Sequence, residues 1–193
     1  QAGGKTIYLT MDAGYEYNNN TTLMLDIAKR KSVTLTFFVT GSFIAHNPTV
    51  VLRMLEDGHQ VGNHTERHLN MPKTLAVSQS AFFEDIIKAE QRYSQLTGEN
   101  FSPYLRPPEG AYSERTLAVL RDMGYQAVFW SFAYNDWRTD QQPDPDQAYD
   151  KIMGQLHHGS VLLLHTVSDT NAAILERLID GIRARGYQIS TLP

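Results

Sequence analysis

The chain has 193 residues, and its 17 basic and 21 acidic side chains give a formal net charge of −4. This length and a hydrophobic fraction of 41% predict a folded protein with a buried core and exclude a disordered chain. The mild acidity and the lack of Lys/Arg blocks argue against nucleic-acid binding, and the absence of cysteine excludes thiolate metal sites, cysteine nucleophiles and disulfides. Any metal ion must therefore be held by His, Asp, Glu or neutral oxygen atoms.

Short apolar runs alternate along the chain with longer amphipathic segments. The runs predict strands, because they are short, apolar and rich in β-branched or aromatic residues. The amphipathic segments predict helices, several of which stop at a glycine. The expected strands are residues 7–11, 33–40, 59–62, 104–105, 127–132, 161–165 and 187–191, and the expected helices are residues 21–31, 49–57, 78–97, 113–123 and 171–185.

This alternation predicts an α/β fold in which helices cover parallel strands, formed by a single domain over residues 1–193. Seven strands are too many for a four- or five-stranded sheet and fewer than a complete eight-stranded barrel has. We therefore expect a reduced, distorted (β/α) barrel with about seven parallel strands, and a doubly wound open sheet is the alternative. The polar residues 141–146, with two prolines, predict a loop inside this domain.

The sequence contains no apolar run of about 18 residues, so we expect no transmembrane segment. Residues 1–4 (Gln-Ala-Gly-Gly) look like a trimmed or mature end without the apolar core of a signal peptide. We expect a signal or anchor to be absent from this sequence, and its absence does not argue for the cytoplasm.

Polar and aromatic side chains collect where the predicted strands end. In a parallel barrel the carboxyl ends of the strands open onto one rim, and functional groups gather there. We therefore expect these side chains to share a site: Asp12, residues 63–68, residues 106–110, residues 135–137 and His165.

Each of these side chains also has a purely structural interpretation. Asp12 could cap a turn, His165 could be a core histidine, and Arg106 could brace a proline loop. His64 and His68 are four residues apart, so on a helical turn both rings would reach one cation, although two surface histidines are the plainer interpretation. Their shared position at one rim favours the functional interpretation.

The same segments carry five ordered motifs that resemble those of the polysaccharide deacetylases, carbohydrate esterase family 4. The resemblance covers most of the chain. Within the family it is strongest for the N-acetylmuramic acid deacetylases that prepare muramic δ-lactam in spore cortex. The motifs are Thr-Met-Asp-Ala-Gly at 10–14, His-Thr-Glu-Arg-His at 64–68, Arg-Pro-Pro-Glu-Gly at 106–110, Asp-Trp at 136–137 and Leu-Leu-His at 163–165.

The resemblance implies a metal-dependent hydrolase that removes N-acetyl groups from N-acetylmuramic acid residues of peptidoglycan. One divalent metal ion, Zn²⁺, would be held by His64 and His68 and would polarise the acetamide. Asp12 would be the general base, Arg106 would keep it ionised, and the backbone N–H of Glu109 would stabilise the oxyanion. His165, paired with Asp136, would protonate the leaving amine. The acetyl pocket would be walled by Trp137, Leu163 and Pro107.

The chain departs from the family pattern at Ala13, where the family has a carboxylate that binds the metal. Two imidazoles are fewer than the three protein ligands that catalytic zinc usually has, so weaker metal binding is expected. The resemblance also implies a glycan substrate, an extracellular or cell-envelope location and a monomer.

Two alternatives remain open at this point. One is a deacetylase of chitin or xylan oligosaccharides, and the other is a glycan-binding module that has lost turnover because of Ala13. A serine hydrolase is disfavoured because no Gly-x-Ser-x-Gly segment occurs. A glycosidase is disfavoured because the histidine pair would have no purpose in it.

Overall fold

The computed structural model describes residues 5–193, so residues 1–4, with their expected trimmed end, lie outside the described part of the chain. Seven strands form one sheet in which every pair is parallel, as the alternation of elements predicts. The strands are β1 (Thr6–Ala13), β2 (Thr36–Val39), β3 (Gln60–Asn63), β4 (Tyr104–Leu105), β5 (Gln126–Ala127), β6 (Val161–His165) and β7 (Gln188–Ser190).

The sheet is curled into an incomplete barrel. Its order is β5-β4-β3-β2-β1-β6, and β7 pairs with the N-terminal half of β1. Beyond β5, Phe132 forms a single bridge with Leu162 of β6, and its carbonyl accepts a hydrogen bond from Leu163 N at 2.9 Å. The expected reduced, distorted barrel of parallel strands is confirmed, in place of a doubly wound open sheet.

The expectation of one continuous strand over residues 127–132 is wrong, because β5 covers only Gln126–Ala127. The buried Arg106 side chain donates hydrogen bonds to the carbonyl oxygens of Val128 and Phe129, at 3.4 and 3.3 Å. These two carbonyls are thus bound by a side chain, and the segment leaves β4 and crosses toward β6.

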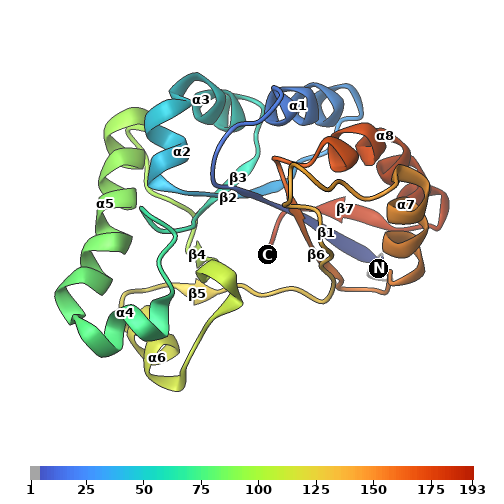
Figure 1. Ribbon diagram of the computed structural model, residues 1–193. Coiled ribbons are helices and arrows are strands. Elements are labelled where there is room, and N and C mark those ends of the chain that lie inside the picture. The colour runs from blue at the N-terminus through green and yellow to red at the C-terminus, as the bar shows by residue number, and fades with distance from the viewer. Residues whose placement is uncertain (1–4) are drawn as a thin grey trace.

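Helices surround the sheet on its outer side (Figure 1). Three of them were not expected from the sequence, namely α2, α4 and α7. Helix α7 begins inside the predicted 141–146 loop, where the Asp144 side chain accepts a hydrogen bond from Gln147 N at 3.0 Å. The helices are α1 (Asn20–Arg30), α2 (Gly41–His46), α3 (Pro48–Glu56), α4 (Met71–Val77), α5 (Gln79–Thr97), α6 (Glu114–Asp122), α7 (Pro145–Gly154) and α8 (Asp169–Ala184), with a 3-10 turn η1 (Pro108–Gly110).

No helix within residues 5–193 has the length and apolar character needed to span a bilayer.

The alternation of side chains along β1 separates the core from the site. Ile7, Leu9 and Met11 are fully buried in the main apolar cluster, which includes residues of α1, α3 and α8. The intervening side chains belong to the other face of the strand, where Tyr8 packs against a second cluster. Asp12 is therefore on the face opposite the main cluster and near the carboxyl end of the strand.

Candidate active site

The expected functional side chains gather at the carboxyl ends of four strands. Asp12 is near the end of β1 and His165 ends β6, while His64 and Arg106 directly follow β3 and β4. They adjoin a cleft of about 1160 Å³, whose walls include Asp12, His64, His68, Pro107, Glu109, Trp137, Leu163 and His165. Arg106 and Asp136 are fully buried behind these residues.

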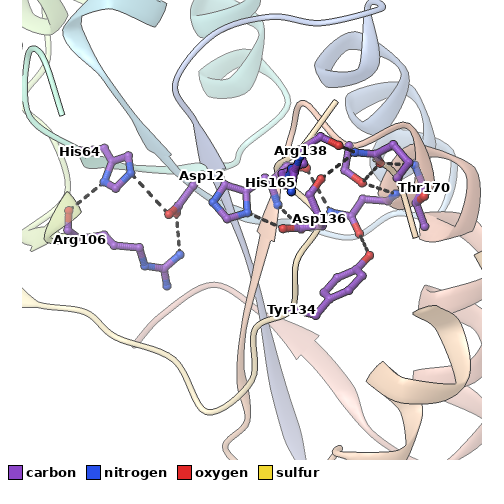
Figure 2. A network of polar contacts seen from close by, with 11 residues as sticks. Asp12, His64, Arg106, Tyr134, Asp136, Arg138, His165 and Thr170 are labelled. Carbon is purple, nitrogen blue, oxygen red and sulfur yellow. Dashed lines mark hydrogen bonds and ion pairs between the residues drawn. The ribbon is translucent and has the colours of Figure 1, made fainter. Parts of the chain in front are cut away.

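Asp12 lies between Arg106 and His64 (Figure 2). Arg106 Nη1 donates to Asp12 Oδ1 at 2.7 Å, and the guanidinium also lies 4.3 Å from the centre of the Phe38 ring. Burial disfavours the charged carboxylate, but the positive charges around it, above all Arg106, outweigh that effect and lower the pKa of Asp12. Asp12 is thus ionised at neutral pH, although its side chain is only 7% exposed.

His64 is a neutral imidazole whose Nε2 atom points to Asp12. Its Nδ1 lies 2.8 Å from the Arg106 carbonyl oxygen, which only accepts, so Nδ1 carries the hydrogen and donates it. Burial, opposed by Asp12 and aided by His68, lowers the pKa of His64 to about 4. Nε2 therefore has a free electron pair 3.5 Å from Asp12 Oδ2. Two electron-pair donors facing each other suit a shared cation.

The second histidine of this motif lies against the first. The His64 and His68 ring centres are 4.8 Å apart. The segment is not the helical turn that the spacing suggested, because Thr65 and His68 have φ values of +64° and +59°. The loop instead folds back on itself, and Thr65 Oγ1 accepts a hydrogen bond from His68 N at 3.1 Å.

This donor set suits a divalent cation held by two imidazoles. A hydrogen bond from the far ring nitrogen to a carbonyl, as at His64, is the usual support for a metal-binding histidine. Within residues 5–193, however, no three His, Asp or Glu side chains form a ready metal cluster. Ala13 is fully buried in the main apolar cluster and has no ligating atom.

The pKa of His165 is shifted in the opposite direction to that of His64. Its Nδ1 lies 2.7 Å from Asp136 Oδ1, and its backbone N donates to Asp136 Oδ2 at 2.8 Å. Burial lowers the pKa of His165, but the hydrogen bond and charge of Asp136 and the charge of Asp12 outweigh it, so the pKa is raised. Asp12 and His165 are partners in register on β1 and β6. A carboxylate with a lowered pKa thus neighbours an imidazole with a raised pKa.

Two residues that the sequence did not single out hold this pair in place. Asn171 Nδ2 donates to Asp136 Oδ2 at 2.6 Å and to the His165 carbonyl at 3.1 Å. Tyr134, a cleft residue, donates its hydroxyl hydrogen to Asn171 Oδ1. Nothing in the sequence distinguishes Asn171 from an ordinary polar residue in the first turn of α8, so only the fold could reveal it.

The Arg-Pro-Pro-Glu-Gly segment has an unusual backbone after Pro107. Glu109 has a φ of +60°, and its carboxylate accepts a hydrogen bond from Asn70 Nδ2 at 2.7 Å. Gly110 has a φ of +63°, and a Cβ there would lie 2.5 Å from Trp130 Cη2. Glycine is therefore required at 110, and the backbone at Glu109 is fixed from both sides.

The three expected acetyl-pocket residues share the cleft with His165. Leu163 and Pro107 are almost fully buried, whereas Trp137 is 52% exposed. The cleft thus combines an apolar floor with one exposed indole ring, a combination that suits the face of a sugar.

Residues 1–128 match the polysaccharide deacetylase family. The chain belongs to this family. It is 39% identical, over 97% of its length and 70% of the relative's, to the peptidoglycan-N-acetylmuramic acid deacetylase PdaA of Bacillus subtilis. The solved structure of that family 4 carbohydrate esterase has a TM-score of 0.90 and covers 99% of this chain and 80% of the PdaA chain. The peptidoglycan-N-acetylglucosamine deacetylase PgdA of Listeria monocytogenes is 32% identical over 97% of this chain and 38% of its own length.

Proposed function

We propose that this polysaccharide deacetylase is a metal-dependent N-deacetylase acting on N-acetylmuramic acid residues of peptidoglycan. The observation that carries the proposal is the pairing of Asp12 with His165 on neighbouring strands, in environments that shift their pKa values in opposite directions. Such a divergence assigns one group as base and the other as acid. The identity to PdaA supports the choice of substrate.

In the proposed reaction, Asp12 takes a proton from the attacking water, whose oxygen then bonds to the acetamide carbonyl carbon. Arg106 keeps Asp12 charged and oriented through its 2.7 Å hydrogen bond. The backbone N–H of Glu109 donates to the developing oxyanion. His165 then passes a proton to the amide nitrogen, the C–N bond breaks, and acetate and a free amine are released.

The metal ion of the proposal would be held by His64 and His68, with zinc as the expected ion. When bound, it would polarise the acetamide carbonyl and so lower the barrier to attack. We infer that Trp137, Leu163 and Pro107 surround the acetyl methyl group, since all three line the cleft with His165. We further propose that residues 1–193 act as one catalytic domain and as a monomer at the cell envelope.

The direct test is acetate release from defined glycan strands. The protein is expected to release acetate from peptide-free strands containing N-acetylmuramic acid, and the mass of each deacetylated sugar would fall by one acetyl group. Chito-oligosaccharides and acetylated xylan serve as the competing substrates. Activity on xylan alone would overturn the choice of substrate, and absence of acetate from all three glycans would favour a glycan-binding module.

Metal dependence is tested by removing and restoring the ion. Chelation is expected to abolish acetate release and added Zn²⁺ to restore it, because the two imidazoles supply only part of a ligand shell and release the ion readily. His64→Gln should lower zinc affinity at least about tenfold, as loss of a ligand or of its support does. His46→Gln, a cleft-lining histidine outside the motif, is the matched control. Full activity of the chelated protein would contradict the proposal.

A further inference from the structure

One part of the cleft is lined by two arginines that have no task in the proposed reaction. Arg67 Nε donates to Asp85 Oδ1 at 3.0 Å, and Arg92 Nε donates to both Glu66 carboxylate oxygens, at 2.7 and 3.0 Å. Within the described residues, neither arginine has a protein partner for its two terminal nitrogens. Each guanidinium is thus held at one end and retains its terminal N–H groups for another acceptor.

The arrangement puts the positive charges in front and the negative charges behind. The Asp85 and Glu66 side chains are 4% and 10% exposed, whereas the Arg67 and Arg92 side chains are 55% and 47% exposed. Asp85 is fixed further, since its Oδ1 also accepts from Arg67 N at 3.1 Å. At this part of the cleft the two guanidiniums are therefore more accessible to an anion than the carboxylates that hold them.

The two arginines are also tied to the segment that carries the proposed metal ligands. Arg67 directly precedes His68 in the chain, and Glu66, the ion-pair partner of Arg92, directly precedes Arg67. A planar guanidinium with free terminal N–H groups matches a carboxylate in shape and charge, and binds it with two parallel hydrogen bonds. A muramyl sugar carries such a group, a lactyl ether carboxylate next to its acetamido group, whereas chitin and xylan backbones do not.

We propose that Arg67 and Arg92 form a carboxylate-binding part of the cleft, which selects glycans with an anionic substituent beside the acetamido group that is cleaved. The inference rests on the proposed function and deepens it, because it names the residues that would distinguish muramic acid from glucosamine. The carboxylate could belong to the lactyl group itself or to a peptide attached to it.

The test compares one glycan in two charge states. Peptide-free muramyl strands are assayed as the free lactyl acid and as the neutral methyl amide, and a third strand carries stem peptides. Arg67→Gln and Arg92→Gln are each expected to raise KM about tenfold for the lactyl acid and to leave the methyl amide unchanged. Arg115→Gln, which removes an exposed arginine outside the cleft, is the matched control. If the two variants raise KM only for the peptide-bearing strand, the bound carboxylate belongs to the peptide.

Equal KM values of the wild-type protein for the acid and the amide would overturn the inference. An equal rise in KM for the acid and the amide in the two variants would also overturn it, since that result would mean that the arginines have a structural role. If Arg67→Gln unfolds because Asp85 loses its partner, Arg67→Lys is the second variant. It keeps a positive charge beside Asp85 and removes only the planar guanidinium that can form two parallel hydrogen bonds. Calorimetric binding of the acid and the amide to an Asp12→Asn protein reads the same selectivity without turnover. It therefore decides the inference even if no muramyl glycan is deacetylated and the proposed function fails.

Discussion

Replacing Asp12 with asparagine is expected to lower kcat for acetate release about 10³-fold, the usual effect of losing a general base. Asparagine has nearly the same shape, so the glycan should still bind and KM should change little. The amide cannot take a proton from water, and Arg106 no longer has a carboxylate to hold. Initial rates of acetate release at neutral pH, with zinc in excess, measure the effect.

Stability needs a separate control in this experiment, because Arg106 is fully buried and would lose its ion pair. Breaking a buried pair costs about 3–5 kcal/mol of unfolding free energy. Asp57→Asn is a matched variant, since the Asp57 side chain is only 6% exposed and pairs with Lys29 and Arg53 away from the cleft. It should lower Tm and leave kcat unchanged. Turnover by a folded Asp12→Asn protein at the wild-type rate would remove Asp12 as the base.

The barrel could be predicted from the sequence because its strands are signalled locally. Residues 161–165 form a strand with the predicted bounds, and β1 extends the predicted 7–11 run by a residue or two at each end. The three unexpected helices are short or begin at a proline after a polar loop, so their apolar pattern is too brief to show a period. The prediction of a strand over residues 127–132 was wrong for another reason. The side chain of Arg106, some twenty residues earlier in the chain, donates hydrogen bonds to two backbone carbonyls of this segment.

The candidate site, like the fold, could be predicted from the sequence only in part. The strand-end rule brings Asp12, His64 and His165 to one rim without knowledge of any contact. It says nothing of Asn171 or Arg92, which lie within helices and reach the site through side chains alone. Such residues look like ordinary surface polar groups until the neighbouring elements are in place. The folded loop at Thr65 and His68 was also beyond prediction, because non-glycine residues rarely adopt a positive φ.

The other large effect is expected at Asp136, which sets the charge of the proposed general acid. His165 can donate a proton only as imidazolium, so kcat should fall as the pH rises through its pKa. Asp136 raises that pKa against the effect of burial, and the active form therefore persists to higher pH. In Asp136→Asn, burial and the charge of Arg106, which lower the pKa of His165, are opposed only by the charge of Asp12, so the pKa drops and the alkaline limb moves to lower pH.

At neutral pH most of the His165 population in Asp136→Asn would then be neutral. The amide oxygen can replace Asp136 Oδ2, which accepts from Asn171 Nδ2 and the His165 backbone N–H, so the amide N–H₂ would face His165 Nδ1 and favour a ring without a hydrogen on that nitrogen. Together these effects should lower kcat at neutral pH about 10³-fold, comparable to losing the carboxylate of a catalytic triad. A kcat–pH profile measures both the drop and the shift. Asp146→Asn, which removes an exposed ion pair with Arg177, should leave the profile unchanged. An unmoved alkaline limb in a folded Asp136→Asn protein would mean that another group donates the proton.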